Sequence, residues 1–379
     1  MPSDTITDSI VENTPRPEQA IASARGFRFE SVDFGEVSDA VLSIWGQWQL
    51  GMAMRSSYFH PEYVACVDRV RDDVRVGLIY DGDELAAIFP YQGSGRFAEP
   101  VGGAINDYHG VISAGNLALN QADVFRLAGM KKFQFHSWID PDESMQRYVY
   151  GPDQAFVADL SAGPDQFIAE LSKQSVAVRR HGQKSRKMMR EIGSLRLEID
   201  SKDTELLNWT IQKKREKYQR TGVVDYFGRA WSRDMLHEIL QRSGTEFAGM
   251  LSVLYAGDKV VATHFGMRSR NVLHYWFPVY DLEYGKYSPG TELFLQIVHQ
   301  SQSLGIDTVD FGYGYDYYKT RLTNRRVDVA RGCVDFNPFR RAMSRTFDAF
   351  VSRIKSSSLK EPVKKAVRKF NPGAGQPKI

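Results

Sequence analysis

Hydrophobic residues recur at helical spacing in some stretches of the chain and in extended runs in others, and this pattern divides the chain into two halves. In the first half, Val41, Ile44 and Trp48 fall on one helical stripe. The turn Asp81-Gly82-Asp83 separates two extended apolar runs, as in a strand–turn–strand unit. We therefore predict an α+β half over residues 26–162. Its predicted elements are helices over 36–49 and 121–127 and strands over 74–80, 85–91, 132–138 and 154–159.

The second half, residues 163–338, mixes helices and strands in a different order. Leu207, Ile211 and Tyr218 lie on one stripe of a strong helix, and short polar turns separate three later apolar runs. Runs separated in this way predict an antiparallel meander. From residue 204 onward the order is helix–helix–β–β–β–loop–helix–β. The predicted helices cover 179–192, 204–220, 232–242 and 289–304, and the strands cover 195–199, 247–255, 260–267, 272–279 and 308–311.

Two flanking segments differ from these halves. Residues 1–25 have no apolar periodicity, and we expect a disordered tail rather than a secretory signal. Residues 339–379 are strongly basic, with ten Lys and Arg against two acidic residues between Arg340 and Lys369. This segment predicts an amphipathic helix, broken at Glu361-Pro362, that lies on an anionic membrane surface or packs on its own domain. Its apolar stripe is Phe347, Phe350, Val351 and Ile354.

Composition and charge exclude several classes of protein. Hydrophobic residues make up 42% of the chain and the net charge is +3, which is ordinary for a globular protein. No run approaches the roughly 18 apolar residues of a membrane-spanning helix. Cys66 and Cys333 offer neither a disulfide framework nor the ligand spacing of a zinc site. We expect a cytoplasmic protein, peripheral at the inner membrane if the basic helix binds lipid, with no metal and no sequence-specific nucleic acid.

The loop before the helix at residue 289 is the most informative local feature. Ser288 suits the N-cap position, Pro289 suits the first helical position, and Gly290 allows another group to approach the backbone. Exposed N–H groups at such a helix start bind phosphate, although an ordinary capped helix would show the same residues. The predicted donor-binding residues are Lys286, Tyr287, Ser288, Gly290 and Thr291.

Candidate catalytic residues lie near this loop in the predicted sheet. The segment from Asp310 to Lys319 ends a strand in glycines and tyrosines, where Tyr318 could give a proton and Lys319 could hold an anionic group. His264, in the middle strand of the meander, and Asp281, just past its third strand, are competing candidates for the base. No nucleophile elbow or metal motif is present, so we expect direct transfer between two bound substrates.

Four segments of the chain carry a resemblance to a known family. They are Ile105–Gly110, Lys214–Gly222, Tyr287–Gly290 and Asp310–Lys319. These segments resemble the CelD/BcsL-like group, which is associated with bacterial cellulose and exopolysaccharide synthesis and is related to the FemAB peptidoglycan aminoacyltransferases. The order of elements resembles the GNAT acyltransferase fold. The resemblance implies two tandem GNAT-like halves, with mixed central sheets flanked by helices and a substrate groove between the halves.

The same resemblance implies an N-acyltransferase, most simply an acetyltransferase, that moves an acyl group from acyl-CoA to an amino sugar of an exopolysaccharide or its lipid-linked precursor. The holdfast-polysaccharide N-acyltransferases of stalked bacteria look like the nearest such relatives. The implied acceptor groove contains Asp107, Tyr108, Tyr218, Arg220, Asp310 and Tyr313.

Two alternatives remain open from the sequence. A FemAB-type enzyme would take aminoacyl-tRNA instead of CoA, and the basic block Lys173–Arg190 could serve that donor. A regulatory protein on a GNAT scaffold could instead bind cyclic di-GMP, because Arg341 and Arg345 have the spacing of two guanidinium groups one helical turn apart.

Overall fold

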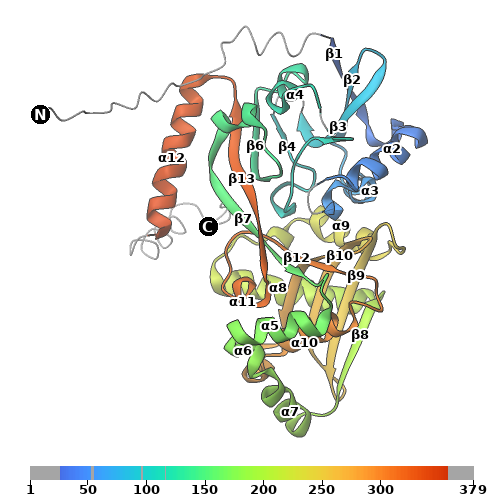
Figure 1. Ribbon diagram of the computed structural model, residues 1–379, viewed down its shortest axis with the longest axis vertical. Coiled ribbons are helices and arrows are strands. Elements are labelled where there is room, and N and C mark those ends of the chain that lie inside the picture. The colour runs from blue at the N-terminus through green and yellow to red at the C-terminus, as the bar shows by residue number, and fades with distance from the viewer. Residues whose placement is uncertain (1–25, 53–54, 95–96, 116, 357–379) are drawn as a thin grey trace, which may run out of the picture.

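One continuous mixed sheet runs through both halves of the chain in the computed structural model, which describes residues 26–52, 55–94, 97–115 and 117–356 (Figure 1). The strand order is β1-β2-β3-β4-β6-β13-β7-β12-β11-β10-β9-β8, with β5 paired to β3. Helices flank this sheet in both halves (Figure 1). The predicted α+β class with mixed sheets flanked by helices is confirmed.

The first half agrees closely with the strands and helices expected from the sequence. The predicted helix at 121–127 and the predicted strand at 132–138 have the expected bounds, whereas β1 and α3 were not predicted. Its elements are β1 (Phe27–Asp33), α2 (Asp39–Gln49), the short helix η3 (Ser57–Phe59), α3 (Pro61–Asp68), β2 (Val74–Asp81), β3 (Glu84–Ser94), β4 (Phe97–Glu99), η4 (Gly103–Ile105), β5 (Ile112–Ser113), α4 (Gln121–Leu127), β6 (Lys132–Trp138) and β7 (Val149–Asp159).

The second half has the predicted order of elements; the predicted helix over 179–192 is confirmed as α7, and the short helix α6 precedes it. Its elements are α5 (Pro164–Gln174), α6 (Val176–Arg179), α7 (His181–Glu191), β8 (Leu195–Ser201), α8 (Thr204–Thr221), α9 (Ala230–Leu240), β9 (Ala248–Ala256), β10 (Lys259–Ser269), β11 (Val272–Tyr280), η7 (Leu282–Tyr287), α10 (Pro289–Gln300), β12 (Thr308–Tyr313), α11 (Lys319–Leu322), β13 (Arg325–Asp335) and α12 (Pro338–Ser356).

Strand β13 joins the two halves. It comes late in the chain, yet it lies between β6 and β7 and pairs antiparallel with both of them. Strand β7 in turn pairs with β12 of the second half. The predicted second domain, residues 163–338, therefore contributes its last strand to the sheet of the first half.

The hydrophobic core also crosses between the halves. One cluster of buried side chains includes Tyr58 and Tyr108 from the first half together with Leu207 and Trp276 from the second. A second cluster packs Phe294 and other residues of α5, α7 and α10 against β9 to β12. Because burial of apolar surface is the main favourable contribution to folding, the first cluster holds the two halves together as one body.

Helix α12 lies alongside β13 and β7 (Figure 1), and two of its described polar side chains form ion pairs with β13. Arg331 Nη1 lies 2.5 Å from Asp348 Oδ1, and Arg340 Nε lies 3.2 Å from Asp335 Oδ2. The expected tail 1–25, the expected break at Glu361-Pro362 and the side chains from residue 350 onward lie outside the described residues. No helix in the described part of the chain is long and apolar enough to span a membrane.

Candidate active site

Strands β11 and β12 run parallel but separate after only three residue pairs. The last of these pairs is His274 with Asp310, and the described residues beyond it form no further pairs between the two strands. Strand β11 remains paired with β10 on its other side. The parting of the strands leaves backbone groups of β11 on the β12 side without a strand partner, at a place where backbone N–H groups can bind a ligand.

His274 joins two aspartates at this parting point. Its Nδ1 lies 3.2 Å from Asp310 Oδ2, and its Nε2 lies 3.2 Å from Asp107 Oδ2. The hydroxyl of Tyr58 is also 3.2 Å from Nε2. Asp310 and His274 come from the second half, whereas Asp107 and Tyr58 come from the first. We call the contact of residues 57–110 with β11 and β12 the seam.

The remaining oxygen of Asp310 is held by two donors. The Tyr108 hydroxyl donates to Asp310 Oδ1 at 2.7 Å, and the backbone N–H of Gly312 donates to the same oxygen at 2.8 Å. These donors stabilise the ionised carboxylate in a site from which water is excluded. The structure thus brings together Asp107, Tyr108 and Asp310, three of the predicted acceptor residues.

Burial and charge act in opposite directions on the pKa of His274. The imidazole is fully buried, which alone would lower its pKa, but the charges and hydrogen bonds of Asp310 and Asp107 raise the pKa to about 9. Burial and, after it, a nearby aspartate raise the pKa of the Tyr58 and Tyr108 hydroxyls well above its usual value, so both stay protonated.

Gly312 brings the turn after β12 against the seam. Its φ is 73°, and a Cβ added there would lie 2.3 Å from Asp107 Oδ2, so only glycine fits. Lys319 Nζ donates to the carbonyl oxygens of Gly312 at 3.3 Å and of Tyr313 at 2.8 Å. The predicted clamp Lys319, the first residue of α11, therefore binds the turn that also contacts Asp107, and it is buried.

The other predicted groove residues are only partly gathered at this turn. Tyr318 packs on Phe311, and burial, followed by the charge of Asp316, raises the pKa of its hydroxyl well above the usual value. Lys217 Nζ of α8 lies 5.9 Å from the centre of the Tyr318 ring. Tyr313 contacts the ring of His136. Tyr218 stacks on Phe227, and Arg220 is exposed near the end of α8.

The predicted donor loop begins α10 as expected, with one difference. Ser288 is the N-cap residue, but its φ is 58° and its side chain does not cap the helix. Instead, Lys184 Nζ of α7 donates to Ser288 Oγ at 2.7 Å. The left-handed backbone of Ser288 turns its hydroxyl toward α7, which brings a cation to the helix start. Thr291 and the half-buried Gly290 lie in the first turn of α10.

Helix α7 and the donor loop form a shared basic surface. Tyr287 donates its hydroxyl hydrogen to Glu191 Oε2 at 2.6 Å, and Lys286 Nζ lies 3.4 Å from the same oxygen. Ser185 donates to the buried carboxylate of Glu292. The sequence block Lys173–Arg190 thus lies against the predicted phosphate site, with Arg179, Arg180, Arg186, Lys187 and Arg190 exposed.

The two candidate bases lie elsewhere in the second half. His264 is fully buried in β10, with its ring stacked on Tyr275 at 4.0 Å, and burial lowers its pKa to about 3. Asp281 accepts from the backbone N–H of Glu283 and lies 2.9 Å from Lys213 Nζ, whose hydrogen bond lowers the pKa of the carboxyl. Their catalytic role stays a prediction.

The predicted cyclic di-GMP pair lies on α12. Arg341 donates from Nη1 to the backbone oxygen of Asp335 at 3.1 Å, and its guanidinium lies 5.5 Å from the centre of the Tyr148 ring. Arg345, one turn later, is exposed. Binding of a nucleotide by this pair stays a prediction.

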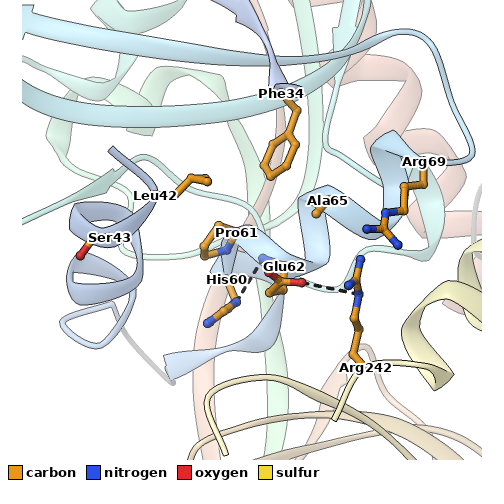
Figure 2. Close-up of a pocket in the computed structure, with 9 residues that line it drawn as sticks. All are labelled: Phe34, Leu42, Ser43, His60, Pro61, Glu62, Ala65, Arg69 and Arg242. Carbon is orange, nitrogen blue, oxygen red and sulfur yellow. Dashed lines mark hydrogen bonds and ion pairs between the residues drawn. The ribbon is translucent and has the colours of Figure 1, made fainter. Parts of the chain in front are cut away.

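Figure 2 shows a separate pocket of about 480 Å³ between α2, α3 and Arg242. Its cations already have carboxylate partners, because Arg242 Nε lies 3.5 Å from Glu62 Oε2 and Arg69 Nη1 lies 3.0 Å from Glu238 Oε2. None of the predicted site residues lines this pocket. In the described part of the chain, no group of three or more His, Cys, Asp or Glu side chains could hold a metal ion.

Sequence reasoning missed three residues of this site. His274 is a single histidine in a predicted strand, the same signal that selected His264 one strand earlier. Tyr58 lies in a short helix that was not predicted. Lys184 belongs to the basic block Lys173–Arg190. It could have been distinguished from its exposed neighbours only by knowing which face of α7 lies against the donor loop.

Comparison with known proteins supports the interpretation of the second half. Residues 177–320 match the family model of the acetyltransferase (GNAT) domain. This segment runs from α6 to α11 and so includes the parting of β11 and β12, the donor loop and Lys319. Residues 177–320 are therefore similar to an acetyltransferase (GNAT) domain, and the protein is an acyltransferase. Asp107 and Tyr58 lie outside the matched segment.

Solved structures show a remote likeness over most of the chain. FemX aligns with a TM-score of 0.49 and 9% identity, covering 80% of this chain and 96% of its own. A tandem GNAT protein from the clavulanic acid biosynthesis pathway aligns with a TM-score of 0.47 and 9% identity, covering 82% and 99%. At these values the likeness carries no argument about activity. No curated protein matches the chain.

Proposed function

We propose that the protein is an N-acyltransferase that moves an acyl group, most simply acetyl, from acyl-CoA to an amino sugar of a bacterial exopolysaccharide or its lipid-linked precursor. The observation that carries the proposal is the cluster of Asp107, His274 and Asp310 where β11 and β12 part. It brings a carboxylate of the first half to the strands of the acetyltransferase domain. An acceptor held by one half would thereby meet a donor held by the other.

The donor site would consist of the start of α10 and the parting strands. Pro289 has no N–H, and Thr291 and Glu292 donate their N–H groups to the carbonyl oxygen of Ser288. The N–H of Gly290 and the positive end of the helix dipole would then bind a pyrophosphate, helped by Lys184 and Lys286. The rest of an acyl-CoA would extend toward His274, where unpaired N–H groups of β11 can stabilise the charge that develops on the thioester oxygen.

The chemistry would be a direct transfer. The neutral amine forms a bond to the acyl carbon, the carbon–sulfur bond breaks, and the amine proton passes to a base. Tyr318, which its raised pKa keeps protonated, would give a proton to the leaving sulfur and recover one from solvent. Lys319 would hold the acceptor or the developing oxyanion.

Binding and turnover assays test this proposal together. Acetyl-CoA and longer acyl-CoAs should raise the melting temperature of the protein, and one of them should acylate a deacetylated amino-sugar oligomer, as mass spectrometry of the product would show. Stabilisation by no acyl-CoA, or no product from any amino-sugar oligomer, would contradict it.

A FemAB-type aminoacyl transfer is the second candidate, and the basic surface of α6 and α7 favours it. Five exposed Arg and Lys side chains lie along α6 and α7, and α7 contacts the loop and helix of the proposed donor site, where the end of an RNA could bind. Deacylated tRNA should then bind with an affinity that falls steeply with salt and compete with acyl-CoA. If tRNA binds without competition, or not at all, CoA remains the donor.

We also propose that α12 brings the enzyme to an anionic membrane surface, where lipid-linked precursors are built. The support is an outward apolar stripe on α12, Phe339, Met343 and Phe347, which are 72%, 59% and 67% exposed. Basic residues flank this stripe, so lipid headgroups would attract the same face.

A further inference from the structure

The hydrogen-bond geometry around His274 favours a proton on both ring nitrogens. Nδ1 faces a carboxylate oxygen of Asp310, which can only accept. Nε2 faces Asp107 Oδ2 and the hydroxyl oxygen of Tyr58. Tyr58 uses its own hydrogen to donate to the backbone oxygen of Ile105 at 3.3 Å, so its oxygen is left to accept. The acceptors on both sides therefore favour an imidazolium.

This cation lies at the edge of the proposed transfer site, where β11 and β12 separate. His274 and Asp310 are the last residues paired between β11 and β12 before these strands part. Asp107, the third member, is the least buried of the three side chains, and it contacts Gly312 on the turn that leads to Lys319. The charge on His274 thus acts on a carboxylate at the edge of the proposed transfer site.

We infer that His274 is a positioning residue of the acyl-transfer site: as an imidazolium it spans the seam and holds the Asp107 carboxylate ionised and fixed against Gly312, ready to accept the proton of the attacking amine. Asp107 would touch the acceptor, and His274 would act only through Asp107. The transfer step of this inference rests on the proposed function. The charge state of the cluster does not.

The transfer balances with the groups at hand. The amine nitrogen bonds to the acyl carbon, its proton moves to Asp107, and the carbon–sulfur bond breaks with its electron pair on sulfur. The thiol takes its proton from Tyr318, and Asp107 and Tyr318 exchange protons with solvent after the products leave. His274 keeps both of its protons throughout.

Other titratable groups around His274 define what a pH experiment would report. Burial and the aspartates keep Tyr58 and Tyr108 protonated, and His264, whose ring stacks on Tyr275 next to His274 in β11, is neutral because its pKa is near 3. Lys319 is the nearby cation on the turn after β12. Between pH 6 and 10 the group of this cluster expected to titrate is therefore His274 itself, near pH 9.

Three variants separate charge from shape. His274→Gln removes the cation and leaves two carboxylates in a buried site, so one of them should take up a proton. His274→Gln combined with Asp310→Asn removes one negative charge as well and should restore an ionised Asp107. Asp310→Asn alone removes the charged partner of Nδ1 but leaves a neutral His274 that can still donate from Nε2 to Asp107, so it separates the role of the His274 charge from that of its hydrogen bond.

The decisive experiment is NMR of the full-length protein, with ¹⁵N-labelled histidine and ¹³Cγ-labelled aspartate, alongside kinetics. In the wild type we expect both nitrogens of His274 to be protonated at pH 7.5 and Asp107 to be ionised. In His274→Gln we expect a protonated carboxyl in the cluster and a kcat at least about 30-fold lower, with the KM for acyl-CoA unchanged. The double variant should recover at least about 5-fold in kcat relative to His274→Gln, and Asp310→Asn alone should lower kcat by less than His274→Gln does.

Separate results overturn the two claims. A neutral His274 at pH 7.5, or an ionised Asp107 in His274→Gln with wild-type turnover, overturns the inference. If the NMR signals are as expected but the wild type acylates no amino sugar, the proposed function fails while the charged cluster stands. If His274→Gln does not fold, the wild-type titration and the double variant still decide the matter.

Discussion

His274 Nε2 lies 3.2 Å from Asp107 Oδ2, and this contact links the acetyltransferase domain to a loop of the other half of the chain. Both groups are buried from water, so each depends on the other to stay charged. The candidate site is consequently a property of the packed pair of halves. Neither half contains it alone.

We expect the stability of the protein to fall as the pH rises from 6.5 to above 9. The pKa of His274 in the folded protein, about 9, is above the ordinary histidine pKa of 6.5. Its contribution to the stability of the fold is therefore fully present below pH 6.5 and is lost as the pH passes 9. The loss should be about 3 kcal/mol in the free energy of unfolding. Urea unfolding at pH 6.5, 8 and 9.5 measures it. If the free energy of unfolding of His274→Gln fell by the same amount over this pH range, groups other than His274 would be responsible.

His264 should have the opposite effect in acid. Its pKa in the folded protein, about 3, is below the ordinary histidine pKa of 6.5. Its contribution to stability is therefore present above pH 6.5 and is lost as the pH falls toward 3. We expect His264→Gln to unfold with a weaker pH dependence between pH 6.5 and 4 than the wild type. If His264 were the base, its removal would instead flatten the acidic limb of kcat/KM, which the same variant would reveal.

Replacing Gly290 should remove donor binding and spare the fold. A Cβ at this position would lie 3.6 Å from Tyr280 Cδ1, an ordinary contact, so Gly290→Val fits the structure. The added side chain would cover the N–H group at the start of α10 that a phosphate needs. We expect loss of acyl-CoA binding by calorimetry and a change in stability under about 1 kcal/mol. Gly35→Val, in open space in the first half, is the control. Retained affinity in Gly290→Val would show that the phosphates bind elsewhere.

Lys319→Ala should lower kcat/KM at least about 10-fold, an effect of about 1.4 kcal/mol on the transition state. The reason is the loss of a buried cation on the turn that contacts Asp107. Steady-state kinetics measures the effect, and Arg321→Ala is the control because Arg321 lies on the same helix, over the ring of Tyr317. A fall in melting temperature with normal turnover would mean that Lys319 only ties the turn together.

The sequence predicted the regular elements well where the local pattern was strong. The helix over 204–220 has a clear apolar stripe, and the meander over 247–279 has polar turns at its corners. Strand β13 was missed because its polar residues, such as Arg325, Arg326 and Asp328, hide the alternation of a strand. Its partners β6 and β7 lie far away in the sequence, and local patterns carry no information about such pairing.

The choice between His264 and His274 shows where sequence reasoning ends. Each is a single histidine in an apolar strand, and the two strands are neighbours in one antiparallel pair. His264 stacks on Tyr275, whereas His274 faces the seam. Which of them meets Asp107 depends on how the first half packs on the sheet. That packing involves contacts distant in the chain, so no spacing within either strand could predict it.

Removing the apolar stripe of α12 should release the protein from anionic vesicles. In a helix that merely covers its own domain, apolar residues face inward. Helix α12 instead contacts the sheet through the ion pairs Arg331–Asp348 and Arg340–Asp335. Its apolar side chains Phe339, Met343 and Phe347 are exposed. Insertion of such side chains and attraction of flanking basic residues both favour an anionic bilayer, the second contributing up to about 1 kcal/mol per residue.

Co-sedimentation with vesicles of phosphatidylglycerol and phosphatidylcholine measures this binding at low and high salt. The wild-type chain should sediment at low salt and much less at high salt, whereas Phe339→Ser with Met343→Ser and Phe347→Ser should stay in the supernatant, as should a chain ending at residue 338. Phe97→Ser is the control, because Phe97 is a similarly exposed aromatic residue, 62% accessible, on β4, which lies two strands away from β13 in the sheet. Because the three serines leave every basic residue in place, their effect isolates insertion from charge. A wild-type chain that stays in the supernatant at low salt would mean that the outward stripe serves a soluble partner.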